Sequence, residues 1–292
     1  MICLKKNIKI ILSMCLIMLT MTSCFKRDDL EGVDIYTTVY PLQYVTDFLY
    51  GYNSTVRSIY PAESNPEDYK LTEKKIEDYS KGAIFIYNGL SNEKSIARDL
   101  LNNNKKLRII DVSQGLEYNS SVEELWMNPR DFLMLAHNIK NGLEGYINNK
   151  YIIEEINKNY EELKVIISAF DAELETATDN AENTDILIAS DTLEFLSKYG
   201  FTVTNVDESN GELSQAVKTK AKKMINDKTV KYIFMLDNQT ETDTIKELSG
   251  SGATIVKLKS MTILSEDDIA NQYNYKTMMR DNLESIKREI FE

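Results

Sequence analysis

The feature that most restricts the fold of this chain is an alternation of short apolar runs with helical patterns, interrupted once near its middle. Before residue 129 and after residue 183, runs such as AIFIY and DILIA alternate with amphipathic segments. Strands that alternate with helices are joined by right-handed crossovers and form a mostly parallel sheet. From Pro129 to about Thr176 no strand pattern occurs, and apolar residues recur at helical spacing. The sequence therefore predicts an α/β fold with two lobes, bridged by one long α-helix.

The predicted organisation has three folded parts. They are an N-terminal α/β lobe over residues 34–128, a linking helical span over residues 129–182, and a C-terminal α/β lobe over residues 183–292. A ligand is expected in the cleft between the lobes, because the loops that follow parallel strands converge there. The predicted strands lie within residues 34–39, 55–61, 83–89, 107–112, 185–190, 201–206, 230–236 and 253–258.

The start of the chain has the features of an export signal. A basic start with three lysines precedes an apolar run over residues 10–19, which is too short and wrongly flanked for a transmembrane helix. The tetrapeptide MTSC that ends at Cys24 resembles a bacterial lipobox, in which the cysteine becomes the lipidated first residue. Cleavage nearby without lipidation is the alternative. We predict a signal peptide over residues 1–23, lipidation of Cys24, and a polar tether over residues 24–33.

Cysteine content and charge exclude several classes of function. All three cysteines lie at or before Cys24, so the exported body has no thiol for disulfides, zinc thiolates or nucleophilic catalysis. The formal charge is −12, and loss of the three leader lysines takes it to −15. A body this acidic does not suit nucleic acid, whose phosphates require a basic face. Cations or a basic partner suit it better.

The sequence offers no recognisable catalytic machinery. Its one histidine, His137, lies on a predicted helix without a second His or Cys at metal-ligand spacing, so we interpret it as structural. No serine lies in a G-x-S-x-G pattern. The chain has 46 acidic residues, so pairs of carboxylates occur by chance. Such pairs therefore do not indicate the acid and base of a hydrolase. We therefore predict that the protein is not an enzyme.

Four acidic loops that lie between a predicted strand and a helix start are the candidate ligand-binding segments. Each loop can also be explained by a purely structural role. Pro66 after Asn65 marks a turn, and acids at helix starts act as caps or suit the helix dipole. Together, two in each lobe, they indicate a site for a cation. The loops contain Glu67 and Asp68, Glu123 and Glu124, Ser190 and Asp191, and Glu266, Asp267 and Asp268.

Eight segments occur in an order that is typical of one known family. They are TTVYPLQYVTDFLYG, YPAESNPEDYKLT, AIFIYNGL, IIDVSQGL, LWMNPRD, LEFLSKYGF, VKYIFML and YKTMMRDNLESIKREIF. From about residue 34 to the C-terminus, the chain thus resembles the cluster A-I (cluster 9) solute-binding lipoproteins of ABC importers for zinc and manganese. Some of these proteins were first described as adhesins. The resemblance implies two α/β lobes, one long rigid helix between them, and a metal held in the cleft.

The resemblance also implies which positions of the first lobe hold the metal, and there the chain departs from the family. The family's loop normally reads Pro-His-Asp/Glu-Tyr, and its histidine is a ligand; the matching residue here is Glu67. The second ligand histidine comes two residues before the Trp that precedes the long helix, and here it is Glu124. Both histidines are therefore replaced by glutamates.

In the second lobe the resemblance implies one ligand at the start of the first helix and one in the late loop. The first position matches Ser190, with Asp191 beside it, and the second falls within residues 265–268, where we assign it to Asp267. An all-oxygen site of this kind favours manganese, calcium or magnesium over zinc. The alternative is that metal binding has been lost and that the acids repel each other or bind something else cationic.

The predicted function is that of a monomeric, extracytoplasmic solute-binding lipoprotein of an ABC importer. Its ligand would be a divalent metal ion, manganese or zinc by resemblance, and its partners the permease and ATPase of that importer. The lipid anchor would hold it on the outer face of the bacterial cytoplasmic membrane. The long helix is expected to limit hinge motion, so that capture depends on loop rearrangement. The competing hypothesis is an adhesion or scaffold lipoprotein of the same fold, and an exported hydrolase is the weakest alternative.

Overall fold

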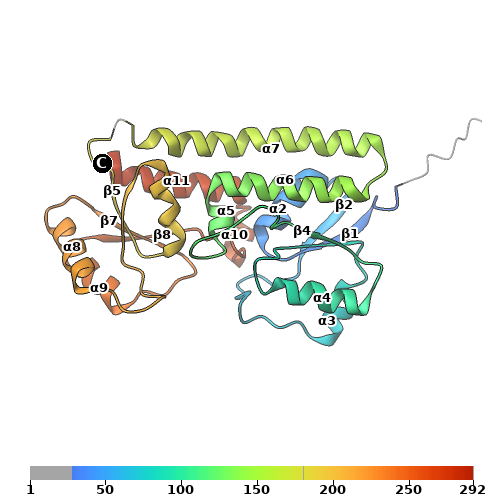
Figure 1. The fold of residues 1–292 in the computed structure, drawn as a ribbon, viewed down its shortest axis with the longest axis horizontal. Coiled ribbons are helices and arrows are strands. Elements are labelled where there is room, and N and C mark those ends of the chain that lie inside the picture. The colour runs from blue at the N-terminus through green and yellow to red at the C-terminus, as the bar shows by residue number, and fades with distance from the viewer. Residues whose placement is uncertain (1–27, 180, 292) are drawn as a thin grey trace, which may run out of the picture.

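The computed structural model describes residues 28–179 and 181–291, and its first lobe is built on a parallel four-stranded sheet (Figure 1). The strand order is β2-β1-β3-β4, and Ile35 of β1 pairs with Val56 of β2 and with Ile84 of β3. The elements of this lobe are β1 (Val33–Thr37), α2 (Tyr40–Tyr50), β2 (Ser54–Ser58), α3 (Glu73–Tyr79), β3 (Ile84–Tyr87), α4 (Glu93–Asn103), β4 (Arg108–Asp111) and α5 (Glu124–Met127).

The second lobe repeats this arrangement. Its four strands are also parallel, in the order β6-β5-β7-β8. All eight predicted strands are present, and the prediction of two α/β lobes with parallel sheets is confirmed. The elements are β5 (Asp185–Ile188), the 3-10 helix η1 (Asp191–Tyr199), β6 (Thr202–Asn205), α8 (Gln215–Asn226), β7 (Tyr232–Leu236), α9 (Asp243–Gly250), β8 (Thr254–Leu258), α10 (Glu266–Ala270) and α11 (Tyr275–Phe291).

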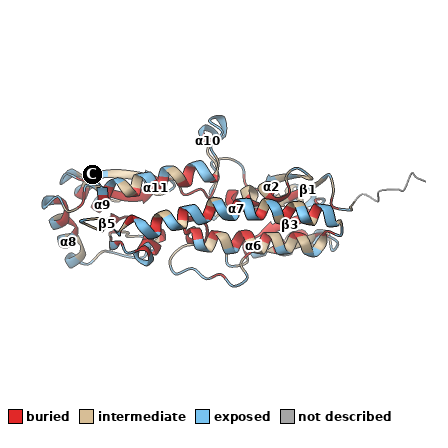
Figure 2. Cartoon of the chain, turned by 90° about the horizontal axis from the view of Figure 1, so that it is seen from above, coloured by how far each residue is buried: buried red, intermediate tan, exposed pale blue. Residues whose placement is uncertain are grey.

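Two consecutive helices occupy the predicted linking span, α6 (Pro129–Tyr146) and α7 (Lys150–Ala177). Asn128 and Asn149 begin them by accepting backbone hydrogen bonds on their side chains, which satisfies N–H groups that the first turn leaves free. Figure 1 shows α7 running across both lobes. The predicted apolar stripe of α7 is buried, while its other face is exposed (Figure 2). The bridging long helix is therefore confirmed as α7.

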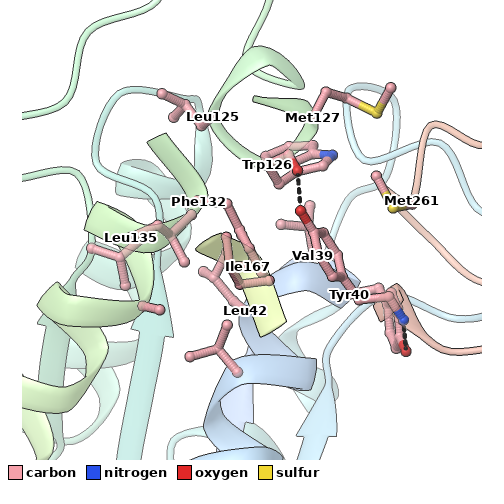
Figure 3. Close-up of a cluster of buried hydrophobic side chains, with 14 of the residues drawn as sticks. Val39, Tyr40, Leu42, Leu125, Trp126, Met127, Phe132, Leu135, Ile167 and Met261 are labelled. Carbon is pink, nitrogen blue, oxygen red and sulfur yellow. Dashed lines mark hydrogen bonds between the residues drawn. The ribbon is translucent and has the colours of Figure 1, made fainter. Parts of the chain in front are cut away.

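The hydrophobic core is continuous from one lobe to the other. One cluster of buried side chains joins the first sheet, α6, α7, η1 and α11, and a smaller one lies under α8 and α9. At the junction, Phe132 of α6 stacks on Tyr275 of α11 with ring centroids 3.9 Å apart. Trp126 lies in the same cluster (Figure 3), and its indole N–H donates to the Ser260 carbonyl at 2.9 Å. A close-packed core of this kind resists large relative motion of the lobes.

The first described residues pack against the body. Leu30 is fully buried, and the Asp28 carboxylate accepts hydrogen bonds from the backbone N–H groups of Asn148 and Asn149, both at 2.9 Å. Residues 28–33, which the sequence assigns to a polar tether, therefore belong to the packed fold. The predicted signal peptide and Cys24 lie outside the described residues. Within residues 28–179 and 181–291, no helix has both the length and the apolar character needed to cross a bilayer.

Two glycines of α6 offer a matched test of this packing. A Cβ added at Gly142 would lie 2.5 Å from Cγ2 of Ile110 in β4, whereas one added at Gly145 meets nothing within 4 Å. We expect Gly145→Ala to raise the free energy of unfolding by about 0.5–1 kcal/mol through helix propensity. Gly142→Ala should instead lower it by about 1–3 kcal/mol, because the core is overpacked. Urea denaturation of both variants checks this, and equal effects at both positions would contradict the close contact.

Candidate functional site

The loops that follow the strands of both sheets enclose one cleft with a volume of about 1010 Å³. The first lobe contributes residues after β2, β3 and β4, and the second lobe contributes residues after β5, β6, β7 and β8. Parallel strands place their carboxyl ends at one edge of each sheet, so loops far apart in the sequence come together here. The cleft lies where the alternation of strands and helices predicts a ligand site.

All charged side chains that line the cleft, among the described residues, are acidic. Eight carboxylates line it, four from each lobe, and no lysine, arginine or histidine does so. Carboxylates within low-dielectric walls concentrate a negative potential and attract cations. The eight are Glu63, Glu67, Glu93, Glu123, Asp191, Asp207, Asp237 and Asp268.

Glu67 lies on the first-lobe wall of the cleft, in an exposed turn ahead of α3. The Asn65 side chain shapes this turn, because its oxygen accepts from the Glu67 N–H at 3.0 Å and its amide donates to Asp68 at 2.8 Å. Asp68 is not among the residues that line the cleft. The Glu67 carboxylate has no hydrogen-bond or ion-pair partner in the described part of the chain, so it is available to a ligand.

Ser190 and Asp191 lie on the opposite wall, at the start of η1. The helix that the sequence predicts here is a 3-10 helix, and neither side chain caps it. Asp191 instead accepts from the side-chain amides of Asn205 and Asn210, at 2.5 and 2.6 Å. The Ser190 hydroxyl is buried without a hydrogen-bond partner among the described residues. The capping interpretation of Asp191 is therefore wrong, and both residues line the cleft.

Glu124 does not line the cleft. Its side chain is buried, with one oxygen 3.2 Å from the Lys198 ammonium and the other accepting from the Asn119 N–H at 3.1 Å. Lys198 belongs to η1, so this ion pair connects the two lobes. A carboxylate engaged in this way already has a cationic partner, and its neighbour Glu123 is the one that reaches the cleft.

In the late loop the structure favours Asp268 over Asp267. Asp267 is exposed on α10 and outside the cleft, whereas Asp268 lines it. Asp268 forms a capping box with Ser265 and an ion pair with Lys259 at 2.8 Å. Burial disfavours its charged form, but the hydrogen bonds from Lys259 and Ser265 outweigh that effect and lower the pKa of Asp268.

Glu93 is the most deeply buried acid of the cleft wall. Burial raises its pKa to about 7, although the Thr38 hydroxyl and the Asn88 N–H both donate to its Oε2, at 2.6 and 2.8 Å. The charge of Asp111 adds to the rise. Burial, and after it the charge of Glu93, raise the pKa of the Tyr60 hydroxyl, which has no hydrogen-bond partner among the described residues. Near neutral pH this carboxyl can therefore hold a proton.

The five predicted ligand residues do not converge on one point. Glu67, Ser190 and Asp191 face one cleft, while Glu124 and Asp267 lie outside it. Within the part of the chain that the structure describes, no three His, Cys, Asp or Glu side chains are close enough together to share a metal ion. Carboxylate and hydroxyl oxygens from opposite walls could bind one cation only after the loops move closer.

Four lining acids were not singled out by the sequence reasoning, namely Glu63, Glu93, Asp207 and Asp237. Asp237 directly follows β7 and Asp207 lies two residues after the end of β6, and the rule that ligands bind at the carboxyl ends of parallel strands could have found them. Glu63 and Glu93 carry no such signal. Glu93 is the first residue of α4, and its burial depends on the packing of α4 against the sheet.

The fold is that of a bilobed binding protein in which the lobes share one core. It has two α/β lobes with parallel sheets, a long connecting helix, and a cleft between the carboxyl edges of the sheets. The chain belongs to the ZnuA family, described as zinc-uptake complex component A, periplasmic, whose model matches residues 35–289. No curated protein matches the chain in sequence.

Solved structures share this fold at low sequence identity. The Zn(II)-bound ZnuA-like domain of Streptococcus pneumoniae AdcA is 19% identical, with a TM-score of 0.72. The metal-dependent lipoprotein YcdH of Bacillus subtilis is 20% identical, with a TM-score of 0.73. The laminin-binding protein Lmb of Streptococcus agalactiae, described as having adhesin and metal-transporting activity, is 18% identical, with a TM-score of 0.70. Each match covers 89% of this chain and 100% of the other.

Proposed function

We propose that this protein is the extracytoplasmic solute-binding subunit of an ABC importer and that it captures a divalent metal ion in the inter-lobe cleft. The observation that carries the proposal is the charge of the cleft, where the described lining includes eight acids and no basic side chain. Membership of a family described by zinc uptake supports it, as do the zinc-bound and metal-dependent structures of the same fold. We assign no catalytic role to the cleft.

The available donors support a proposal for the cargo. The cleft offers carboxylate and hydroxyl oxygens, and its described lining contains neither His nor Cys. Hard cations such as manganese, calcium and magnesium prefer oxygen ligands, whereas zinc is commonly bound through nitrogen and sulfur. Among these ions, manganese is also a cargo that the family resemblance implies, so we take manganese as the first candidate and zinc as the second. An adhesive role need not exclude transport, since Lmb is described as having both activities.

Partners and location complete the proposal. The protein would deliver its ion to a permease and ATPase in the membrane, acting as a monomer held by a lipid on Cys24. Asp28 is four residues from Cys24 and fixed against the α6–α7 turn. Four extended residues span at most about 14 Å, so this end of the first lobe would lie close to the bilayer.

The proposal predicts how single cleft acids affect cation binding. Glu67→Gln and Asp191→Asn, one on each wall, should each weaken manganese binding about tenfold or more, because each removes one carboxylate from an all-oxygen site. Asp68→Asn, next to Glu67 but outside the cleft, is the matched control and should bind as the unchanged protein does. Calorimetric titration of the metal-stripped protein measures all three.

Two results would contradict the proposal. A melting temperature that does not change with manganese, zinc or calcium would exclude capture of these ions, since a ligand of the native state must stabilise it. Equal loss of binding in Asp68→Asn and Glu67→Gln would show that the effect comes from the turn and not from the cleft wall. Uptake of radioactive manganese by cells with and without the protein tests the transport step separately.

A further inference from the structure

A lysine ammonium group contacts two acids of the second-lobe wall. Lys259 directly follows β8, and its Nζ lies 2.8 Å from Oδ1 of Asp268 and 3.6 Å from Oδ2 of Asp237. Both acids line the cleft, one from the loop after β7 and one from α10, which projects from the body in Figure 2. The ammonium therefore neutralises two acids that would otherwise face a cation in the cleft.

Both carboxylates are also held by bonds that do not involve the lysine. Oδ1 of Asp237 accepts from the Ser260 N–H at 2.9 Å. Oδ2 of Asp268 accepts from the backbone N–H and the hydroxyl of Ser265, at 3.0 and 2.7 Å. In each acid one oxygen is thus committed to the loop, and the other is directed to Lys259. If the ammonium left, the two oxygens would keep their orientation toward the same point.

Hydrogen bonds also hold the backbone of Lys259 in place, so its side chain can move while the backbone does not. Its N–H donates to Oδ1 of Asn282 at 2.8 Å, and the Asn282 amide donates back to its carbonyl at 2.9 Å. The side chain is one-third exposed, and its four-carbon stem rotates freely compared with a planar guanidinium. Displacement of the ammonium from the two acids therefore requires no change in the main chain.

Two unpaired hydroxyls on the same wall point to a ligand other than the lysine. The side-chain oxygens of Thr262 and Ser190 are buried and have no hydrogen-bond partner among the described residues, and both residues line the cleft. A buried polar group without a partner is costly, so native structures rarely retain one without a role. Hydroxyl and carboxylate oxygens together are ligands that suit a hard divalent cation.

We propose that Lys259 is a tethered competitor of the captured ion. Its ammonium holds the place between Asp237 and Asp268 that a divalent cation takes over when it binds, and the lysine then turns toward solvent. This inference rests on the proposed capture of a cation in the cleft and identifies the residue that limits its affinity. An ion with two charges replaces one with a single charge, so the exchange favours divalent over monovalent cations.

The test is removal of the competing charge. In Lys259→Met the stem remains and the ammonium is lost, so manganese should bind at least tenfold more tightly than to the unchanged protein. The rise in melting temperature with added manganese should also be larger, because the variant without metal leaves two acids uncompensated. Lys259→Arg keeps the charge and should show no gain. Lys257→Met, on β8 in an ion pair with Glu241 at 3.4 Å, is the matched control.

The outcomes separate this inference from the proposed function. Equal manganese affinity in Lys259→Met and the unchanged protein overturns the inference while capture of the ion stands. Binding by the variant alone overturns both, because in the natural protein the lysine would then exclude the ion and never exchange with it. Absence of binding in both overturns both. Should Lys259→Met fail to fold, Lys259→Gln carries the same expectation, and adding Asp237→Asn to either variant should abolish the gain.

Discussion

Replacing Trp126 by alanine is expected to lower the free energy of unfolding by about 3–5 kcal/mol. Trp126 is among the largest fully buried side chains, and its indole N–H donates to the Ser260 carbonyl across 134 positions of sequence. Its own carbonyl accepts from the Tyr275 hydroxyl at 2.7 Å. The substitution therefore removes the ring that packs in the cluster of Figure 3, leaving a cavity at the junction of the lobes, and it removes the donor to the Ser260 carbonyl.

Urea denaturation followed by far-ultraviolet circular dichroism measures this effect. Trp126→Phe keeps an aromatic ring and loses mainly the N–H, so it should cost about 1–2 kcal/mol. Tyr52→Ala, at a side chain that is 92% exposed, should change stability by less than about 0.5 kcal/mol. A loss below about 1 kcal/mol for Trp126→Ala would mean that the lobes do not depend on this junction.

Replacing Glu93 by glutamine is expected to stabilise the protein by about 3 kcal/mol at pH 8 and by little at pH 4. Burial raises the pKa of Glu93 to about 7 in the folded protein, against 4.5 for an ordinary glutamate. Between those values the folded state holds a proton that the unfolded state has lost, so the stability of the natural protein falls as pH rises. Above pH 7 the full penalty of a buried charge is present, and glutamine removes it.

The measurement is the free energy of unfolding of both proteins at pH 4, 6 and 8. The glutamine oxygen can still accept from the Thr38 hydroxyl and the Asn88 N–H, so the hydrogen bonds of the site are kept. Glu73→Gln is the matched control, since Glu73 is likewise the first residue of its helix but is exposed. It should alter stability by less than about 0.5 kcal/mol at every pH. A pH-independent difference for Glu93→Gln would contradict the raised pKa.

The architecture could be predicted because its signals are local. Strands such as β3 and β7 are short apolar runs that alternate with amphipathic helices, and the apolar stripe from Ile152 to Leu174 marks α7 without any knowledge of its neighbours. Glu67, Ser190 and Asp191 could also be placed, because each follows a strand of a parallel sheet, whose carboxyl edge is known in advance.

The same reasoning could not say which of two adjacent acids lines the cleft, because a neighbour in space decides it. Glu124 and Glu123 are adjacent and chemically equivalent, and nothing local distinguishes them. The turn into α5 directs one to Lys198 and the other to the cleft. Asp267 and Asp268 differ in the same way, because the capping box with Ser265 turns Asp268 inward.

The sequence by itself determined the two α/β lobes, the helix between them, the acidic character of the molecule and the loops that face the cleft. These properties depend on periodicity, composition and chain order, which are independent of tertiary contacts. Only the tertiary structure decided which acids are free, which are paired, and that Lys259 and Lys198 already neutralise some of them. The residue type alone shows that a side chain is acidic. Whether that acid can bind a ligand depends on partners that folding brings from distant positions.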